Sequence, residues 1–559
     1  MNRLSKLYAL AILGGLSTSI SFAQTQTKGE VQDQEFVIRK DRVLTVPTQP
    51  RAFEKLPVLP QPKGLSDFNY ETKRYGLDLR PLNLEATAVD KVYRKDRRDL
   101  YPGFIKAGYG NFASPLLEAR FMATEVDQFN FSAVLDHQSF GKGPVADEQS
   151  QESHSHAGID GSYFSDVVEI FGGLDWNQDK YSFYGVDPVT FEDPDYLTPD
   201  NVFNRFSIQA GVRDIEKTGP ITYESQLGFR TFQDSYAAME NEFSLQAKGK
   251  YRVNEDWRAD LGISYFGTTP ENVDYMENRN YFSIRPSVSY RYGDFDFTAG
   301  INIVSENDSI EDKSSDFRIF PNLGASYQFA DEFGFFAEFS GDVDRKTYQS
   351  FVLENPWLGP TNRLLNTVNN YHIEAGIQGQ FSEIFNYRGS VNFDRYNQLY
   401  FFVNSPLDPS QFQLVYDDKS TVISIQGELS LQLSEVYRLG SSLNLYQYNL
   451  NTLEEAWHRP IWEFSINNQV KPIDALLIQA NLNFIGGIKA PSVLSSEDAP
   501  TPFTTLKSIA DVQLMADFAI TDRLSVFAQG NNLLNGLNTR WLNYPVRGVL
   551  LEGGLSFKF

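Results

Sequence analysis

From Gly103 to the C-terminus, apolar and polar residues alternate in segments of about ten residues. In residues 421–433, Ile425 and Leu429 share one face of an extended chain, while Glu428 falls on the other. Successive side chains of a strand point to opposite faces, so the pattern predicts strands between an apolar and a polar environment. Two structures fit: a membrane-spanning barrel, or a water-soluble β-sandwich with an internal core.

Three features favour the membrane barrel. Connections alternate between short turns and long loops, as in outer-membrane barrels with short periplasmic turns and long outer loops. Aromatic residues gather near the predicted strand ends, as in an interfacial girdle. The chain also ends in Phe559, on the apolar face of its last strand. The short turns are expected near residues 166, 254–256, 293–294, 382–383, 434–435 and 521–522, and the long loops at 185–202, 343–367 and 487–504.

The number of strands follows from the length of this region. Residues 103–559 hold about 22 alternating segments, or about 21 residues for each strand and its connection, which suits strands of about 9–11 residues. An even number is required if both ends of the barrel lie on the periplasmic side. The predicted fold class is therefore all-β: a transmembrane antiparallel β-barrel of about 22 strands, within a range of 20–24, preceded by an N-terminal periplasmic or lumenal arm. Pro286 and Pro321 fall inside predicted strands, where we expect a local bulge.

The N-terminal region has a different character. Residues 1–23 contain Arg3 and Lys6, a short apolar run, and small residues that end at Ala23, which is typical of a cleavable secretory signal peptide. Residues 24–102 are rich in proline and charge and lack sustained periodicity, which indicates an arm rather than a folded core. The expected organisation is a signal peptide (1–23), a mildly basic arm (24–102) and a barrel (103–559).

Charge separates the arm from the barrel. The whole chain has a formal charge of −23 and no cysteine, which disfavours nucleic-acid binding and excludes disulfides and thiolate metal sites. The arm carries +3 and the barrel −28. Because barrels of about 16–18 strands already leave a channel, a lumen of 22 strands needs an occluding segment. We hypothesise that the arm enters the acidic lumen; a separate partner protein is the alternative. The basic residues expected near the lumen mouth are Arg94, Lys95, Arg97 and Arg98.

The C-terminal hairpin carries a family resemblance. The sequence Asn532-Leu-Leu-Asn535, then Pro545-Val-Arg547-Gly548 and the terminal Phe559, resembles the C-terminal hairpin of TonB-dependent outer-membrane receptors, although Arg and Gly stand in inverted order. The resemblance implies a 22-stranded barrel in the outer-membrane lipid and recognition of Phe559 by the barrel-assembly machinery. It also implies a plug before the barrel, but residues 24–102 are fewer than such a plug contains and show no Gly-rich plug pattern. Use of TonB is left open: residues 35–38 could pair with a partner by strand addition, or form an ordinary strand or linker.

Candidate sites have alternative interpretations. His154 and His156 share one face of a strand near acidic residues, so they could bind a divalent metal or simply begin a solvated strand. Two acidic loops could bind Ca²⁺ or be solvated, charge-rich loops; their acids are Asp187, Glu192, Asp193, Asp195, Glu306, Asp308, Glu311, Asp312 and Asp316. Charged residues expected to face the lumen could orient a polar solute or only line it: Arg285, Arg291, Arg318, Glu428, Asp511, Asp517 and Glu552.

No catalytic or cofactor-binding motif is present, so we expect neither enzymatic activity nor a cofactor. We predict a protein of the outer membrane of a didermic bacterium that moves or binds a small solute through a lumen occluded by the arm. The alternative is a non-transporting scaffold barrel that docks an envelope partner protein for secretion, assembly or uptake. The sequence does not identify the solute.

Overall fold

The structure, a computed structural model of the chain, describes residues 101–559 except 127, 187–198, 217–218, 274, 308–315, 362, 435 and 492–502. The signal peptide, the arm up to residue 100 and residues 35–38 therefore lie outside the described residues. The same holds for the predicted arm cations and for most of the loop acids: Arg94, Lys95, Arg97, Arg98, Asp187, Glu192, Asp193, Asp195, Asp308, Glu311 and Asp312.

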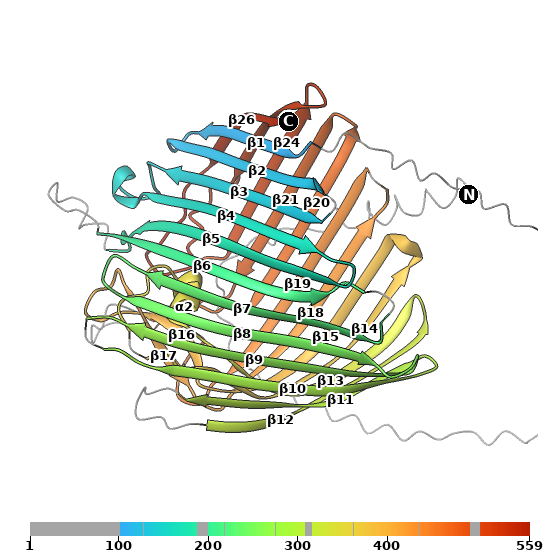
Figure 1. Ribbon diagram of the computed structural model, residues 1–559. Coiled ribbons are helices and arrows are strands. Elements are labelled where there is room, and N and C mark those ends of the chain that lie inside the picture. Colours follow the sequence, from blue (N-terminus) through green and yellow to red (C-terminus); the bar gives the residue numbers. More distant parts are fainter. Residues whose placement is uncertain are drawn as a thin grey trace, which may run out of the picture. The chain divides into compact units, whose positions relative to one another are not determined.

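In the described part of the chain, 22 strands between Gly103 and Lys558 form one antiparallel sheet that closes on itself (Figure 1). The first strand, β1 (Gly103–Gly110), pairs with the last, β26 (Leu550–Lys558), from Phe104 opposite Lys558 to Gly110 opposite Glu552. The predicted fold class and strand number are confirmed. Closure leaves no free edge, so every strand is paired on both sides.

The other strands follow one another around the ring in chain order. They are β2 (Ser114–Val126), β3 (Phe129–Phe140), β4 (Glu152–Phe164), β5 (Val168–Ser182), β6 (Asp200–Asp214), β7 (Ile221–Gln233), β8 (Met239–Arg252), β9 (Trp257–Glu271), β10 (Arg279–Tyr292), β11 (Phe295–Asn307), β12 (Asp316–Ala330), β13 (Phe333–Asp344), β14 (Thr367–Phe381), β15 (Phe385–Asn397), β18 (Ser420–Gln432), β19 (Tyr437–Asn449), β20 (Trp462–Ile473), β21 (Leu476–Gly486), β24 (Ile509–Ala519) and β25 (Leu524–Asn531).

The two ends of the barrel differ in their connections. At the turn end, where β1 begins and β26 ends, the strands are joined by short turns such as residues 293–294 and 382–384. At the loop end, several connections are long and contain further elements. These are the helix α2 (Tyr348–Glu354), the hairpin of β16 (Leu399–Asn404) and β17 (Phe412–Asp417), and the short pair β22 (Lys489–Pro491) and β23 (Phe503–Thr505).

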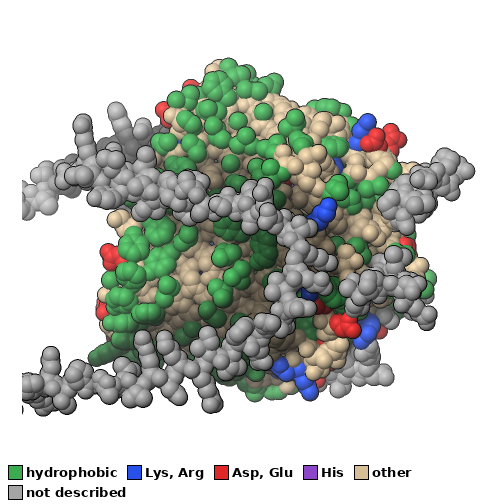
Figure 2. Space-filling model, turned by 180° about the vertical axis from the view of Figure 1, so that it is seen from behind, with side chains coloured by type: hydrophobic (Ala, Val, Ile, Leu, Met, Phe, Trp, Pro, Cys, Tyr) green, Lys and Arg blue, Asp and Glu red, His purple; other side chains and the backbone are tan. Residues whose placement is uncertain are grey.

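The outer face of the wall is apolar and exposed. On β18, Ile425 and Leu429 are each 49% exposed, and the terminal Phe559 is 43% exposed. In Figure 2, hydrophobic side chains cover much of the visible wall, and charged side chains gather near its rims. So much exposed apolar surface is stable only against an apolar solvent such as the lipid acyl chains.

Aromatic rings line the turn end of the outer face over β9 to β15. Trp257 stacks on Tyr290 with centroids 4.4 Å apart, and Phe295 stacks on Tyr327 at 4.2 Å. Rings of this kind suit the boundary between acyl chains and headgroups.

The expected bulges at Pro286 and Pro321 are not found. The register of β9 with β10 is continuous through Pro286 opposite Leu261, and that of β11 with β12 is continuous through Ile301 opposite Pro321. Proline has no backbone N–H, and the pairing with the other neighbouring strand is interrupted at each proline. Bridges between β10 and β11 skip Pro286, and those between β12 and β13 begin after Pro321. The prediction was wrong because a proline can remain in register where one neighbouring ladder is interrupted.

Within the described ranges, no helix has the length and apolar character needed to cross a membrane.

Candidate functional site

The inner face of the barrel is polar, and contacts that skip strands identify it. The guanidinium of Arg285 on β10 donates to Asp342 on β13 at 2.9 Å, and the Gln138 amide on β3 donates to Glu552 on β26 at 3.0 Å. Each contact passes over two strands, which requires the concave side of the sheet. The side chains on the same faces as these residues therefore line the lumen.

A chain of opposite charges crosses the lumen wall from β2 to β6. Arg120 contacts Asp136 at 2.5 Å, and Asp136 lies 3.2 Å from the ring of His156. The other side of that ring lies 2.8 Å from Asp175, which in turn is 3.5 Å from Arg205. Neighbouring strands thus carry alternating charges that partly neutralise one another.

The predicted metal candidates lie in this part of the wall, but each has its own carboxylate partners. The ring nitrogens of His154 lie 2.7 Å from Glu152 and 2.7 Å from Asp179, and those of His156 face Asp136 and Asp175. With both nitrogens occupied by carboxylates, each ring acts as a donor bridging two acceptors. Among the described residues, no group of three or more His, Asp or Glu side chains is arranged to hold a metal ion.

The predicted lumenal arginines pair with nearby carboxylates rather than with the predicted acids. Besides the contact of Arg285 with Asp342, Arg291 pairs with Asp296 at 2.8 Å near the turn end, and Arg318 with Asp316 at 3.0 Å near the loop end. The predicted acids lie on other strands: Glu428 on β18, Asp511 and Asp517 on β24, and Glu552 on β26.

Among those acids, Glu552 and Asp511 are held by hydrogen bonds. Glu552 is 4% exposed and accepts from Gln138 and, at 2.6 Å, from Gln529. Asp511 accepts from the Gln513 amide at 2.6 Å and from the backbone N–H of Asn532 at 3.1 Å. The structure therefore does not bring the seven predicted residues into one cluster; it distributes them around the ring.

The wall from β18 to β21 is less ionic and carries mainly amides and hydroxyls. Ser442 and Ser465 share a hydrogen bond of 2.7 Å. Two adjoining cavities of about 310 and 300 Å³ share Ser430, Gly440 and Asn467 in their linings. Uncharged donors and acceptors of this kind suit a water-filled path for polar solutes.

A packed structure of loops, which the sequence did not reveal, lies at the loop end, and we call it the loop cap. We define it as residues 183–186, 345–361, 363–366, 398–419, 450–461 and 532–549, which come from five connections between strands. Its core contains Phe351, Leu358 and Leu364, each no more than 1% exposed. Long loops at 343–367 and nearby were expected, and their apolar residues were the signal that could have indicated a core.

Three aromatic side chains meet at the centre of the cap, and we call them the aromatic junction. Trp357 stacks on Tyr544 with ring centroids 3.9 Å apart, and Tyr184 contacts Tyr544 at 4.8 Å and Trp357 at 5.9 Å. Their loops follow β5, β13 and β25, and eight, eight and six strands separate these loops around the ring. Loops from such evenly spaced positions can meet only over the lumen, so the cap spans the mouth.

Two hydrogen bonds fix the aromatic junction. The hydroxyl of Tyr184 donates to the carbonyl of Pro545 at 3.1 Å, and the indole N–H of Trp357 donates to the carbonyl of Ser182 at 3.0 Å. Gly185 lies so close to Tyr544 that a Cβ would come within 2.1 Å of its ring. The close approach of these loops therefore requires glycine there.

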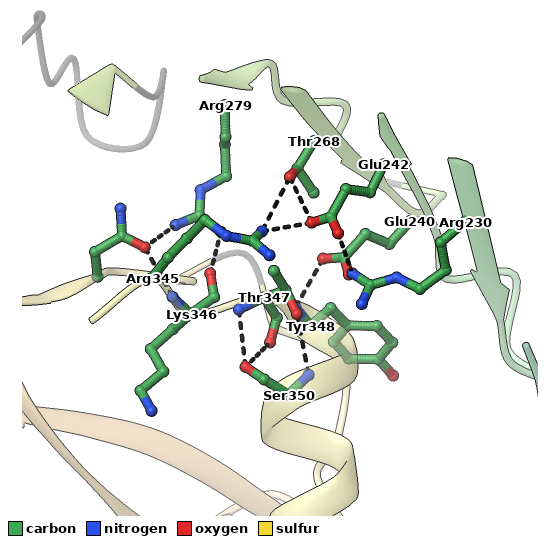
Figure 3. A network of polar contacts seen from close by, with 11 residues as sticks. Arg230, Glu240, Glu242, Thr268, Arg279, Arg345, Lys346, Thr347, Tyr348 and Ser350 are labelled. Carbon is green, nitrogen blue, oxygen red and sulfur yellow. Dashed lines mark hydrogen bonds and ion pairs between the residues drawn. The ribbon is translucent and has the colours of Figure 1, made fainter. Parts of the chain in front are cut away.

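A buried ionic network attaches the loop of α2 to the inner wall (Figure 3). Glu242 on β8, 6% exposed, accepts from Arg345 of the loop at 2.5 Å and lies 3.2 Å from Arg230 on β7. Glu240 is fully buried and accepts from the backbone N–H of Tyr348 at 2.8 Å. These contacts hold the start of the helix against strands on a different part of the ring.

The helix itself begins at a capping box next to the network (Figure 3). The Thr347 side chain accepts from the backbone N–H of Ser350 at 3.1 Å, and the Ser350 side chain accepts from the N–H of Thr347 at 2.8 Å. Behind it, Arg279 on β10 donates to the carbonyl of Lys346 at 2.7 Å and to Asn366 at 2.9 Å. Both ends of the loop are thus bonded to the wall.

Two buried titratable groups join further segments of the cap. The ring of His458 is 1% exposed; its Nδ1 donates to the carbonyl of Phe402 at 2.8 Å and its Nε2 accepts from the N–H of Leu542 at 3.3 Å. Burial lowers the pKa of His458 to about 4. Burial would raise the pKa of Asp417, but hydrogen bonds from Ser420 and the 451–453 segment outweigh it and lower this pKa to about 2.

Comparisons with solved structures match the barrel. The FrpB iron transporter from Neisseria meningitidis is 12% identical over 82% of this chain and 81% of its own, with a TM-score of 0.64. The ferric-catecholate import receptor Fiu from E. coli K12 is 9% identical over 83% and 82%, with a TM-score of 0.61. The siderophore receptor PirA from Acinetobacter baumannii is 10% identical over 82% and 80%, with a TM-score of 0.61.

These similarities define the class of fold. The barrel has the fold of TonB-dependent outer-membrane receptors, which confirms the resemblance seen in the C-terminal hairpin. The sequence matches no protein-family model and no curated protein. At these low identities the similarity extends to the fold and not to the solute.

Proposed function

We propose that the protein is an outer-membrane channel or receptor for a small solute, whose mouth is held shut at rest by its own loop cap. The observation that carries the proposal is the aromatic junction, where three evenly spaced loops meet over a polar lumen. A polar lumen supports passage of hydrophilic solutes, and a closed mouth supports a gated rather than a permanently open pore.

The orientation follows from the two ends. Short turns mark the periplasmic side of outer-membrane barrels, so the loop cap faces the exterior and the strand start at Gly103 faces the periplasm. Residues 24–102, after removal of the signal peptide near Ala23, form a periplasmic or lumenal arm in this proposal. The arm would occlude the lumen from the turn end, with Arg94, Lys95, Arg97 and Arg98 near its opening.

Single-channel recording in planar bilayers tests both proposed closures of the pore, by the loop cap and by the arm. We expect the full chain to stay closed, the Tyr544→Ala variant to conduct, and Tyr544→Ala with residues 24–98 deleted to conduct more. Because the cap would mask any effect of the arm, the deletion is informative only in the variant with the opened cap. No added conductance there would reject the arm as an occluding segment, and a silent barrel in all three proteins would reject transport.

A second function, a non-transporting scaffold, is favoured by one observation: the cap is built like a folded domain, with its own core and buried ion pairs. In that case the barrel would dock an envelope partner protein and move no solute. Mild detergent extraction distinguishes the two functions. A stoichiometric partner together with a sealed lumen supports the scaffold, whereas a lone barrel that conducts after the cap is opened supports transport.

The similar structures include receptors and transporters for iron and siderophores. The shared barrel fold and the apolar outer wall support a location in the outer membrane of a didermic bacterium, with lipid around the wall and assembly through the terminal Phe559. Neither they nor the lumen of this chain supports an enzymatic role. Which solute this barrel accepts is a separate question, because a shared fold does not determine what a protein binds.

A further inference from the structure

A cavity of about 360 Å³ lies on the lumen side, beneath the part of the cap formed by residues 538–548. Its lining combines apolar residues from β3, β24 and β26 with charged residues. Such a volume falls within the range of small-molecule sites. The residues that matter for the argument are Phe140, Ile509, Leu550, Asp511, Arg540 and Arg547.

The two arginines of the cavity differ in whether a carboxylate pairs with them. Arg547 pairs with Glu152 at 2.6 Å and stacks over the ring of Phe140 at 3.8 Å. Arg540 is half-buried and lies over the ring of Trp541 at 5.7 Å. In the part of the chain that the structure describes, no carboxylate lies within ion-pair distance of Arg540. A half-buried guanidinium without a counter-ion favours an anionic ligand.

Asp511 supplies the opposite charge. Its carboxylate accepts two hydrogen bonds, from Gln513 and from the N–H of Asn532, and keeps further acceptor capacity. No cation pairs with it among the residues described. Arg540 and Asp511 therefore line one cavity without neutralising each other, which leaves a positive and a negative pole beside an apolar wall.

We propose that this cavity binds a zwitterionic amino acid or short peptide with an apolar side chain. Arg540 would take the carboxylate, Asp511 the ammonium group, and Phe140, Ile509 and Leu550 would contact the side chain. A purely anionic or cationic ligand would satisfy one pole and leave the other unpaired. The assignment deepens the proposed function and rests on it for the meaning of the ligand, since a bound peptide is cargo only if the lumen conducts.

Equilibrium dialysis of the full-length protein in detergent, with L-leucyl-L-leucine as the probe, tests the site. Trp541 fluorescence offers a second readout because this residue adjoins Arg540. We expect saturable binding of the dipeptide and at least tenfold weaker binding of N-acetyl-L-leucyl-L-leucine and of L-leucyl-L-leucinamide, which each lack one charge. Equal binding of all three probes, or no binding of the dipeptide, would overturn the assignment.

Matched variants identify the poles. Arg540→Gln and Asp511→Asn should each weaken dipeptide binding at least tenfold, and Arg523→Gln, at the turn end over the ring of Tyr101, should leave it unchanged. If Arg540→Gln binds like the parent protein, the arginine is not the carboxylate partner and the proposal fails. Because no conductance is measured, failure here leaves the proposed channel standing, and a silent channel leaves this binding result valid.

Discussion

The barrel wall and the loop cap bury opposite kinds of side chain. In the wall, apolar residues such as Ile425 are half exposed on the outer face, and the polar residues point inward. In the cap, Phe351 and Leu364 are fully buried in a core of its own. The wall depends on lipid as its apolar partner, whereas the cap supplies its own. One chain thus combines a membrane structure with a core typical of a water-soluble domain.

The difference extends to how each region is held together. Wall strands pair with their neighbours in the ring, so their contacts are repeated and local. The cap joins loops that are six to eight strands apart, through single contacts such as that of Trp357 with Tyr544. A single substitution should therefore do more damage in the cap than in the wall.

The largest expected effect comes from removing the centre of the aromatic junction. Tyr544→Ala deletes a ring that contacts both Trp357 and Tyr184, and a buried aromatic of this size contributes about 3–5 kcal/mol. We expect bilayer conductance to rise from a closed baseline. Phe335→Ala, which removes a ring that is 55% exposed on the outer face, is the control and should stay closed. A closed Tyr544→Ala channel would show that the aromatic junction alone does not hold the mouth shut.

Loss of the ionic anchor of α2 should have the next largest effect. Arg345→Gln removes one partner of the buried Glu242, which costs about 3 kcal/mol since Arg230 remains nearby. Chymotrypsin should then cleave residues 345–366 faster in detergent solution. Arg291→Gln breaks an exposed pair that contributes at most about 1 kcal/mol, and it should not alter cleavage. Equal cleavage of the two variants would argue against an anchoring role.

Substitutions at two adjacent residues of β18 test which face of the wall meets lipid and which faces the lumen. Ile425→Arg places a charge against lipid and should destabilise the barrel by about 2–4 kcal/mol near the membrane midplane. Gln426→Arg places the same charge in the wet lumen and should cost little. Urea unfolding of the two proteins in lipid vesicles measures the difference. Equal losses of stability would contradict the assignment of the two faces.

The smallest expected effect is on the stability of the cap, and it comes from the titration of His458 below neutral pH. Its pKa is lowered from 6.5 to about 4 in the folded cap, so the unfolded cap binds more protons between these values. Stability is complete above pH 6.5 and falls as the pH drops from 6.5 to 4, by at most about 3 kcal/mol.

Tryptophan fluorescence against pH, reported by Trp457 and Trp541, should show this loss in the parent protein. His458→Gln lacks the titrating group, so its profile should be flat over the same range. A further loss below about pH 3.8, where Asp417 takes up a proton in the unfolded cap but not yet in the folded cap, should persist in both proteins. An identical slope between pH 6.5 and 4 in both would assign the effect to another group.

The wall could be predicted from the sequence because apolar and polar side chains alternate along its strands with a period of two residues. Alternation of the kind seen at Ile425 and Leu429 reports the face of every strand, and length then gives the number of strands. The cap could not be predicted, because its core depends on which loops meet in space. Neither Trp357 nor Tyr544 carries a local signal that it will stack on the other.

The candidate site shows the same limit. The alternation of polar and apolar residues placed Arg285 and Asp511 on polar faces. The ion pairs depend in addition on where the strands lie around the ring, which brings Asp342 within reach of Arg285. The unpaired state of Arg540 is likewise a property of the assembled cap. The proline bulges failed for a related reason: local propensity at Pro286 was overridden by pairing that stays in register.

The contact between Tyr184 and Pro545 joins residues 361 positions apart in the chain. Contacts of such long sequence separation form only after the intervening chain has been placed, because closing a long loop is entropically unfavourable. The loops can therefore lock together only once the last strands have been added and the ring has closed. The time at which the cap becomes resistant to proteolysis would therefore report when insertion of the barrel into the membrane is complete.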